Sequence, residues 1–176
     1  MTVTDVNVVK SAIFERPDDA NKGTLGSLLC VCGSYGMAGA AVMSAKGALR
    51  TGIGLAKCAL PRSIYPIVAQ TIFESVYYPL SENADGRISK VNVPFLVSES
   101  CKSSATLVGC GLGVCDDTLK IVFSLIENST TPLVLDADAL NCVAKQPEIL
   151  LRKKAPIIIT PHPGEMSRLT GLATPL

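Results

Sequence analysis

The sequence predicts an α/β fold in which helices cover both faces of a mostly parallel central sheet. Short apolar runs alternate with longer helical segments along the chain, which is the order that a parallel sheet requires. Glycine-rich or polar loops follow several of these runs. Apolar residues make up 48% of the 176 residues and charged residues only 18%, so the chain can bury a sizeable core. We find no internal repeat or linker and expect a single domain over residues 1–176.

The first half of the chain predicts three strands and two helices. Gly52 and Gly54 follow the first helical segment, and Pro61 stops the second apolar run. In chain order we expect a strand at 25–33, a helix at 39–50, a strand at 55–60, a short helix at 64–70 weakened by Pro66, and a strand at 73–78.

The second half predicts three more strands. Residues 81–90 are polar and contain the turn pair Asp85 and Gly86, whereas residues 91–104 carry no decisive pattern. Beyond them we expect a strand at 105–108, a helix capped by Asp116 and ending near residue 127, a strand at 132–136, a mostly helical segment at 138–152 interrupted by Pro147, and a strand at 156–160.

Charge and cysteine content argue against several classes of protein. The net charge of +1 favours neither nucleic acid nor a membrane as a partner. We see no secretory signal and no apolar run of about 18 residues, and we therefore expect a cytoplasmic protein. Cys30 and Cys32 are spaced like metal ligands, but the chain has seven cysteines and one histidine. An odd count opposes a disulfide framework, and the lone histidine opposes a zinc site, so we interpret the cysteines as small buried residues.

Glycines, carboxylates and the histidine should meet at one edge of the sheet, because ligands of open α/β sheets bind beyond the carboxyl ends of the strands. The segments that follow four of the predicted strands are residues 33–39 (GSYGMAG), 109–113 (GCGLG), 136–138 (DAD) and 160–165 (TPHPGE). The first loop fits neither the Walker pattern nor a dinucleotide fingerprint. Glycines in both glycine-rich loops allow close approach of a ligand, or they only make tight turns.

The polar residues in these loops have two interpretations each. Asp138 suits a helix cap, which leaves Asp136 as the better candidate for a polar or magnesium-linked role, with Asn141 one helical turn after Asp138. His162 lies between two prolines on a stiff loop, and we expect it to bind ligand. Glu165 suits the start of a helix and also the support of magnesium through water.

Six motifs occur in an order that resembles the NAD(P)H-hydrate dehydratases of the ribokinase-like superfamily, formerly described as carbohydrate kinases. The motifs are 22–24 (KGT), 33–34 (GS) with 37–41 (MAGAA), 50–55 (RTGIGL), 109–113 (GCGLG), 135–141 (LDADALN) and 160–165 (TPHPGE). The last is the most specific, and the resemblance extends from about residue 20 to residue 171. It implies a three-layer ribokinase-like fold. One departure is Cys110, at a position where the family commonly has proline.

The resemblance implies a repair activity that uses ADP or ATP with Mg²⁺ to remove water from hydrated NADH or NADPH. A phosphoryl group would pass to the ring hydroxyl, and phosphate would then leave. Carried over by position, the contacts to the nicotinamide nucleotide would come from Ala40, Ala41, Gly109, Gly111, Gly113 and His162. Lys22, Asp136, Asn141 and Glu165 would line the cleft or support magnesium.

The larger departure is the absence of the Gly-Thr-Gly-Asp motif that provides the family's catalytic base. We therefore name no catalytic residue and expect the chain to be the N-terminal, substrate-binding portion of such a fold, without most of the nucleotide site. An exposed sheet edge would then favour a homo-oligomer. Two alternatives stay open: a small-molecule kinase of the same fold, acting on a carbohydrate or vitamin precursor, and a catalytically inactive binding or scaffold domain.

Overall fold

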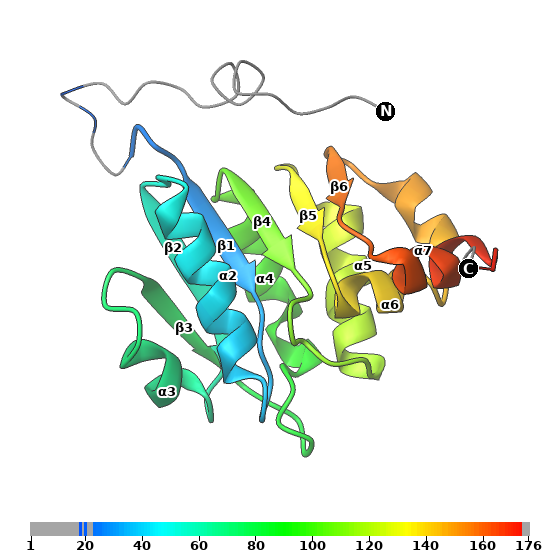
Figure 1. Cartoon of the computed structure of the whole chain (residues 1–176), viewed down its shortest axis with the longest axis horizontal. Helices are drawn as coiled ribbons and strands as arrows, with labels where there is room; N and C mark the ends of the chain where they lie inside the picture. Colours follow the sequence, from blue (N-terminus) through cyan, green and yellow to red (C-terminus); the bar gives the residue numbers. More distant parts are fainter. Residues whose placement is uncertain (1–17, 19, 21–22, 174–176) are drawn as a thin grey trace.

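A six-stranded, fully parallel sheet forms the centre of the part of the chain that the structure describes, residues 18, 20 and 23–173 (Figure 1). The structure is a computed structural model. The strands are β1 (Ser27–Val31), β2 (Leu55–Pro61), β3 (Val76–Leu80), β4 (Ala105–Val108), β5 (Leu133–Leu135) and β6 (Ile157–Ile159). Their spatial order is β3-β2-β1-β4-β5-β6, so the chain winds outward from β1 in both directions.

Helices cover both faces of the sheet, as the alternating pattern predicts. The helices are α2 (Ala38–Arg50), α3 (Tyr65–Ala69), α4 (Val93–Cys101), α5 (Asp116–Asn128), α6 (Asp138–Val143) and α7 (Pro163–Thr170), with 3-10 helices at Lys90–Asn92 and Pro147–Arg152. In Figure 1, α2 lies in front of the sheet and α4 and α5 lie behind it. The longest described helices have 13 residues, well short of the ~20 that cross a bilayer.

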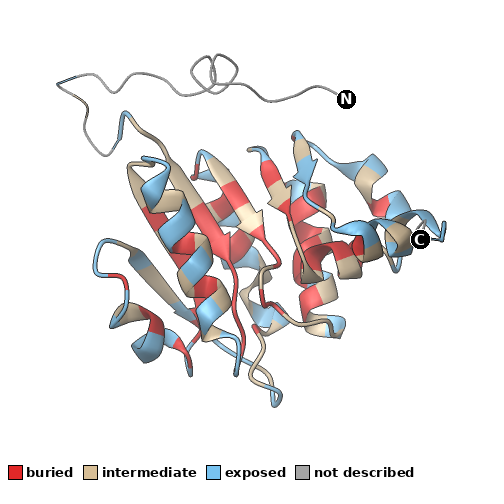
Figure 2. Cartoon of the chain, in the orientation of Figure 1, coloured by how far each residue is buried: buried red, intermediate tan, exposed pale blue. Residues whose placement is uncertain are grey.

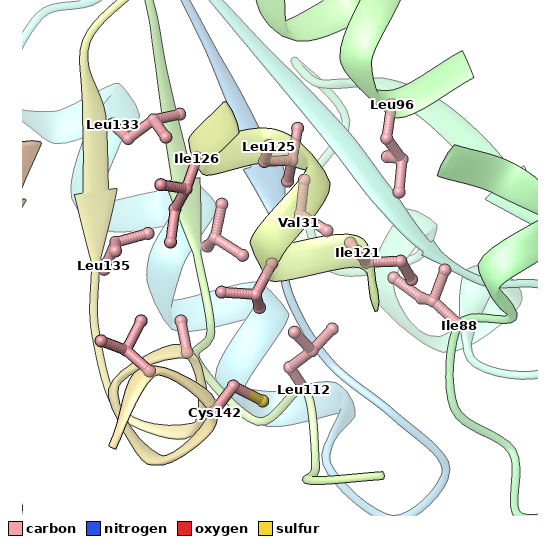
Figure 3. Packing of buried hydrophobic residues seen from close by; sticks show 14 of the residues in the cluster. Val31, Ile88, Leu96, Leu112, Ile121, Leu125, Ile126, Leu133, Leu135 and Cys142 are labelled. Atoms are coloured by element: carbon pink, nitrogen blue, oxygen red, sulfur yellow. The ribbon is translucent and has the colours of Figure 1, made fainter. Parts of the chain in front are cut away.

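Two hydrophobic clusters fill the spaces between the sheet and these helices. The larger one packs α4, α5 and α6 against the sheet through aliphatic side chains such as Val31, Leu96 and Leu125 (Figure 3). The smaller one packs α2 and α3 against Cys30, Cys58 and their neighbours. Figure 2 shows the buried residues concentrated in the strands and on the inner sides of the helices, whereas α7 is mostly exposed. Strand β1 contributes Val31 to the larger cluster and Cys30 to the smaller one. Its successive side chains thus face opposite sides of the sheet, as in a buried parallel strand.

Four local predictions need correction or completion. The third strand is Val76–Leu80 and not residues 73–78, because Phe73 is 84% exposed in the preceding turn. The ambiguous residues 91–104 contain α4. The cap of α5 is Cys115, whose side chain forms a capping box with Thr118, and Asp116 is the first helical residue. Asp138 likewise lies inside α6 and not at its cap.

The loops of the predicted ligand edge that follow β1 and β4 are held by backbone contacts at the carboxyl ends of these strands. Gly109 N–H donates to the carbonyl of Val31 over 3.2 Å, and Gly33 N–H donates to the carbonyl of Cys110 over 2.9 Å. These contacts extend the parallel pairing of β1 and β4 beyond the strands. Loops that the sequence separates by more than 70 residues are therefore held side by side.

Candidate functional site

The bare backbone of residues 109–113 forms the floor of the candidate site. Gly111 packs against the start of α2 so closely that a Cβ there would lie 2.6 Å from the Cβ of Ala40. Ser34, which is 6% exposed, fixes the same loop by donating its hydroxyl to the carbonyl of Gly111 over 2.8 Å. Ala40 thus lies at the predicted cleft, whereas Ala41 is 2% exposed and packs in the core beside Gly33.

Gly109 joins this floor to the loop that follows β5. Its φ of +123° belongs to the region that favours glycine, and a Cβ would collide with the carbonyl oxygen of Asp136. Gly113, with a φ of +75°, donates its N–H to Oδ2 of Asp138 over 2.8 Å. These glycines therefore serve tight backbone packing, one of the two roles that the sequence left open. The packing also brings Asp136 and Asp138 to the floor.

The two aspartates flank a strained turn. Ala137 has φ 48° and ψ −114°, the first central position of a turn in which Ala139 N–H donates to the carbonyl of Asp136 over 3.0 Å. Asp136 accepts from the Thr160 hydroxyl over 2.8 Å and from the Cys110 thiol over 3.3 Å. Asp138 accepts from Gly113 and from the Asn141 amide, the latter over 3.3 Å. All these donors are neutral groups.

His162 and Glu165 form the cap of α7. The backbone N–H of His162 donates to Glu165 Oε2 over 2.9 Å, and His162 Nδ1 accepts from Gly164 N–H over 3.1 Å. Nε2 lies 3.2 Å from Glu165 Oε1. Because Nδ1 accepts, the hydrogen of the neutral ring is assigned to Nε2. The imidazole is 61% exposed while the Glu165 side chain is 7% exposed, so Glu165 orients a histidine that faces solvent.

Asn141 links the aspartate turn to α7. Its amide donates to Asp138, and its Oδ1 accepts from Arg168 Nε over 2.9 Å. The loops after β5 and β6 are thereby connected through side chains, in addition to the bond from Thr160 N–H to the carbonyl of Leu135 over 3.2 Å. The structure brings Asn141 next to Asp138 as expected, with an arginine that the sequence did not single out.

A thiol pair lies beneath the same floor. The neighbouring Cys110 and burial raise the pKa of Cys32, and the neighbouring Cys32 lowers the pKa of Cys110. The Asp136 carboxylate beside Cys110 acts in the opposite direction and raises the pKa of Cys110. The family departure noted at Cys110 therefore places a thiol with a lowered pKa at the site.

The described residues contain no group of three or more His, Cys, Asp or Glu side chains arranged to hold a metal ion. Mg²⁺ is commonly held by one or two carboxylates together with substrate phosphates and water. Asp136 and Asp138 fit that supporting role, since each carboxylate has more acceptor positions than the two donors it receives. Glu165 fits less well, because its oxygens face His162.

Sequence reasoning missed Arg87 and Thr160. Thr160 follows β6 directly, a position that the rule for strand ends could have identified. Arg87 comes from the polar turn, and no sequence pattern connects it to the glycine loop. Its guanidinium packs so closely against Gly113 that a Cβ on Gly113 would collide with it.

Beside the polar turn is a cavity of about 470 Å³, which is lined by Tyr35, Ser63, Glu82, Asn83, Ala84, Asp85 and Gly86.

Comparison with known proteins identifies the family. The model of a family described as NAD(P)H-hydrate dehydratase matches residues 28–175, most of the chain. This chain belongs to the NAD(P)H-hydrate dehydratase family. The matched region contains β2 to β6, all of β1 except Ser27, and all the site loops described above.

Relatives of this NAD(P)H-hydrate dehydratase domain are longer than the chain. A bifunctional NAD(P)H-hydrate repair enzyme of Thermofilum pendens is 38% identical over 156 residues, which are 89% of this chain and 30% of the relative. An ADP-dependent (S)-NAD(P)H-hydrate dehydratase of Neisseria meningitidis is 33% identical over 89% of this chain and 49% of its own length. The chain thus spans between about a third and a half of these relatives.

A solved structure supports the ribokinase-like, three-layer fold. The ADP/ATP-dependent NAD(P)H-hydrate dehydratase of Bacillus subtilis, co-crystallised with ATP and Mg²⁺, superimposes with a TM-score of 0.72 at 28% identity. The match covers 94% of this chain and 54% of that protein. The family and fold predictions are confirmed. The roles of individual site residues stay predictions, and Lys22 lies outside the described residues.

Proposed function

We propose that this chain carries the substrate-binding portion of an ADP- or ATP-dependent dehydratase that repairs hydrated NADH and NADPH. The observation that carries the proposal is the joining of the glycine floor, the two aspartates and the His162 loop at one sheet edge by direct hydrogen bonds. The family membership of residues 28–175 supports the choice of substrate. We keep residues 1–176 as one domain in this proposal.

The glycine floor suits a flat ring. Gly109, Gly111 and Gly113 let Ala139, Ala40 and Arg87 pack directly against the loop, so in this proposal a hydrated nicotinamide lies beside small methyl groups and the Arg87 side chain. A larger side chain at Ala40 would occupy the space directly above Gly111. In this proposal the small residues select a thin substrate and exclude water from its face.

Polar groups around the floor would orient the substrate. His162 exposes its imidazole beyond α7 and is held by Glu165, so the ring can contact the substrate without a large loss of side-chain freedom. Arg87 beside Gly113 provides a guanidinium for a substrate phosphate, a group that arginine binds through two parallel hydrogen bonds.

ADP or ATP with Mg²⁺ would supply the phosphoryl group that makes the ring hydroxyl a leaving group. In this proposal Asp136 and Asp138 hold magnesium-bound water at the floor, since each has acceptor positions beyond the two donors it receives. Asn141 keeps Asp138 in place, and Glu165 acts only through His162. The proposal assigns no catalytic base among the residues described.

Binding measured by thermal unfolding tests the proposal. The purified chain would be titrated with hydrated NADPH, with NADPH and ADP as comparison ligands. Hydrated NADPH at 100 times its dissociation constant should stabilise the fold by about 2.7 kcal/mol, and NADPH should have a smaller effect. No stabilisation by the hydrate, or equal stabilisation by all three, would contradict a substrate site in this chain.

His162→Asn provides the sharpest variant, because asparagine removes the imidazole but can still cap α7. We expect the variant to keep its melting temperature and to bind hydrated NADPH at least about 10-fold more weakly, the effect of one lost polar contact. Lys153→Ala is the matched control, since Lys153 is exposed and precedes β6 at the opposite edge of the sheet. Equal affinities for the two variants would remove His162 from the site.

A further inference from the structure

Two cysteines from distant parts of the sequence meet beneath the glycine floor. Cys32 follows β1 and is 1% exposed, and Cys110 follows Gly109 and is half-buried. Both are free thiols, and each shifts the pKa of the other. Cys110 also packs against the cluster of α2 and α3 that contains Cys32. One member of this pair thus faces the site and the other lies in the core.

An extra residue after β4 brings the two thiols together. The parallel register pairs Val31 with Val108, and Gly109 N–H accordingly donates to the carbonyl of Val31. The next bond of a regular ladder would join Gly33 N–H to the carbonyl of Gly109. The observed acceptor is the carbonyl of Cys110, one residue later. Gly109 and Cys110 therefore both oppose Cys32, as in a β-bulge.

This arrangement suits a disulfide bond. Adjacent strands are separated by about 4.8 Å, and the Cα atoms of bonded cysteines lie roughly 4.4–6.8 Å apart. Because Cys32 and Cys110 oppose each other where β1 and β4 end, bond formation needs side-chain rotation and not a movement of the strands. Cys30 and Cys58 are also opposite each other, on β1 and β2, but both are 2% exposed in the core. Cys30 and Cys58 therefore serve as a control pair, because they are close together but cannot be reached from the site.

The Cys110 thiol also connects this pair to the aspartate turn. It donates to Oδ2 of Asp136 over 3.3 Å, while Oδ1 of Asp136 accepts from Thr160. A disulfide has no S–H, so Asp136 would lose one of these two donors. A change at the cysteine pair is thereby transmitted to a carboxylate at the floor of the site.

We propose that Cys32 and Cys110 form a reversible intramolecular disulfide that senses peroxide and alters the floor of the site through Asp136. Cys110 is attacked first because it is the accessible member. Its sulfur takes up one oxygen of hydrogen peroxide to give a sulfenic acid and water. The Cys32 sulfur then attacks the Cys110 sulfur, the S–O bond breaks, and a second water leaves with the thiol proton. Two thiols and one peroxide thus give one disulfide and two waters.

Mapping of the disulfide tests the proposal directly. The reduced full chain would be treated with hydrogen peroxide, digested under acid conditions and analysed by mass spectrometry. We expect a cross-link between the peptides containing Cys32 and Cys110, loss of two free thiols per chain, and full reversal by dithiothreitol. A cross-link between Cys30 and Cys58, or oxidation of Cys110 to sulfinic acid without a cross-link, would overturn it.

Matched variants separate the pair from the other cysteines. Cys110→Ser and Cys32→Ser should each abolish the intramolecular cross-link, whereas Cys58→Ala should leave its yield unchanged. Cys101→Ser removes the exposed thiol that can link two chains. Persistence of the intramolecular cross-link in Cys110→Ser would contradict the assignment. If either serine variant folds poorly, the Cys58→Ala and wild-type maps still decide between the two pairs.

The effect on the site rests on the proposed function, whereas formation of the disulfide does not. We expect oxidation to weaken binding of hydrated NADPH by about 10-fold, the effect of losing one hydrogen bond to a charged group, and reduction to restore it. Unchanged affinity after complete oxidation would refute the coupling to Asp136. Absence of binding by the reduced chain would instead refute the proposed function and leave the disulfide map unaffected.

Discussion

The two faces of the sheet are packed with side chains of different size. Between the sheet and α4, α5 and α6 lie mainly leucine, isoleucine and valine, including Leu96, Ile121 and Leu125 (Figure 3). Between the sheet and α2 and α3 lie more alanines and cysteines, including Ala45, Cys30 and Cys58, beside Leu60, Ile64, Val68 and Ile72. The α5 face also buries a hydroxyl network in which Ser100 contacts both Thr106 and Ser129.

The difference separates stability from ligand access. Large aliphatic side chains contribute most of the apolar area removed from water, so we expect the α5 face to determine the free energy of unfolding. Small residues on the other face let α2 approach β1 closely, and its first turn then lies against Gly111. The face that contributes less to stability thus shapes the candidate site and also places Cys32 beside Cys110.

Truncation on each face tests this comparison with the largest expected effect. Leu125→Ala should lower the free energy of unfolding by about 3–5 kcal/mol, because Leu125 is fully buried and the substitution leaves a cavity. Cys58→Ala, its counterpart on the α2 face, should cost only about 1 kcal/mol. Urea denaturation of both variants measures the difference, and equal losses would show that the faces contribute alike.

Gly109→Ala tests the junction between the two faces. A Cβ there would collide with the Asp136 carbonyl at a φ of +123°, so we expect a loss of about 3 kcal/mol or more. Gly36→Ala is the control, since Gly36 has a φ of +82° with open space around it and should cost about 1–2 kcal/mol. Thermal unfolding compares them. Similar losses would mean that backbone conformation, and not the collision, dominates.

Glu99, on α4, makes a contribution to the free energy of unfolding that depends on pH. The hydrogen bond from Lys102, followed by one from Tyr78, holds the pKa of Glu99 below its usual value. A depressed native pKa stabilises the fold above the unfolded pKa, and this contribution disappears as pH falls through the native pKa.

Glu99→Gln should therefore reduce stability by about 1 kcal/mol at pH 7 and by progressively less below about pH 4.3. Glu127→Gln is the control, because Glu127 pairs only at the surface with Arg152, whose side chain is 62% exposed. Melting temperatures between pH 3 and pH 7 would measure both. A constant difference for Glu99→Gln across this range would contradict the assignment.

The smallest expected effect is at the aspartate turn on the site edge. Ala137→Gly should raise the free energy of unfolding by up to about 1 kcal/mol, since relief of the positive φ exceeds the entropy that glycine loses. Ala144→Gly should instead lower it by about 0.5–1 kcal/mol, because Ala144 has an ordinary helical conformation. Calorimetry resolves the opposite signs. A loss in both variants would mean that Ala137 is not strained.

The sequence predicted most strands, because buried parallel strands are short apolar runs with clear ends. The shift of β3 arose because Pro79 lies inside it; Pro79 is permitted there since β3 is an edge strand in the described sheet. Asp116 and Asp138 were expected to cap helices, but both caps lie one residue earlier. Boundaries at this scale depend on hydrogen bonds that Thr118 or Gly113 supplies, and local sequence does not show them.

The sequence by itself determined the α/β class and, through its ordered motifs, the family, and it predicted the edge of the sheet that carries the candidate site. Periodicity and strand-end rules are local, so a single chain displays them. Only the tertiary structure decided that Arg87 packs on Gly113, that Thr160 and Cys110 share Asp136, and that a one-residue slip places Cys110 beside Cys32. These contacts depend on the register between strands and on loop conformation, which arise from packing across the sheet and not from neighbouring residues.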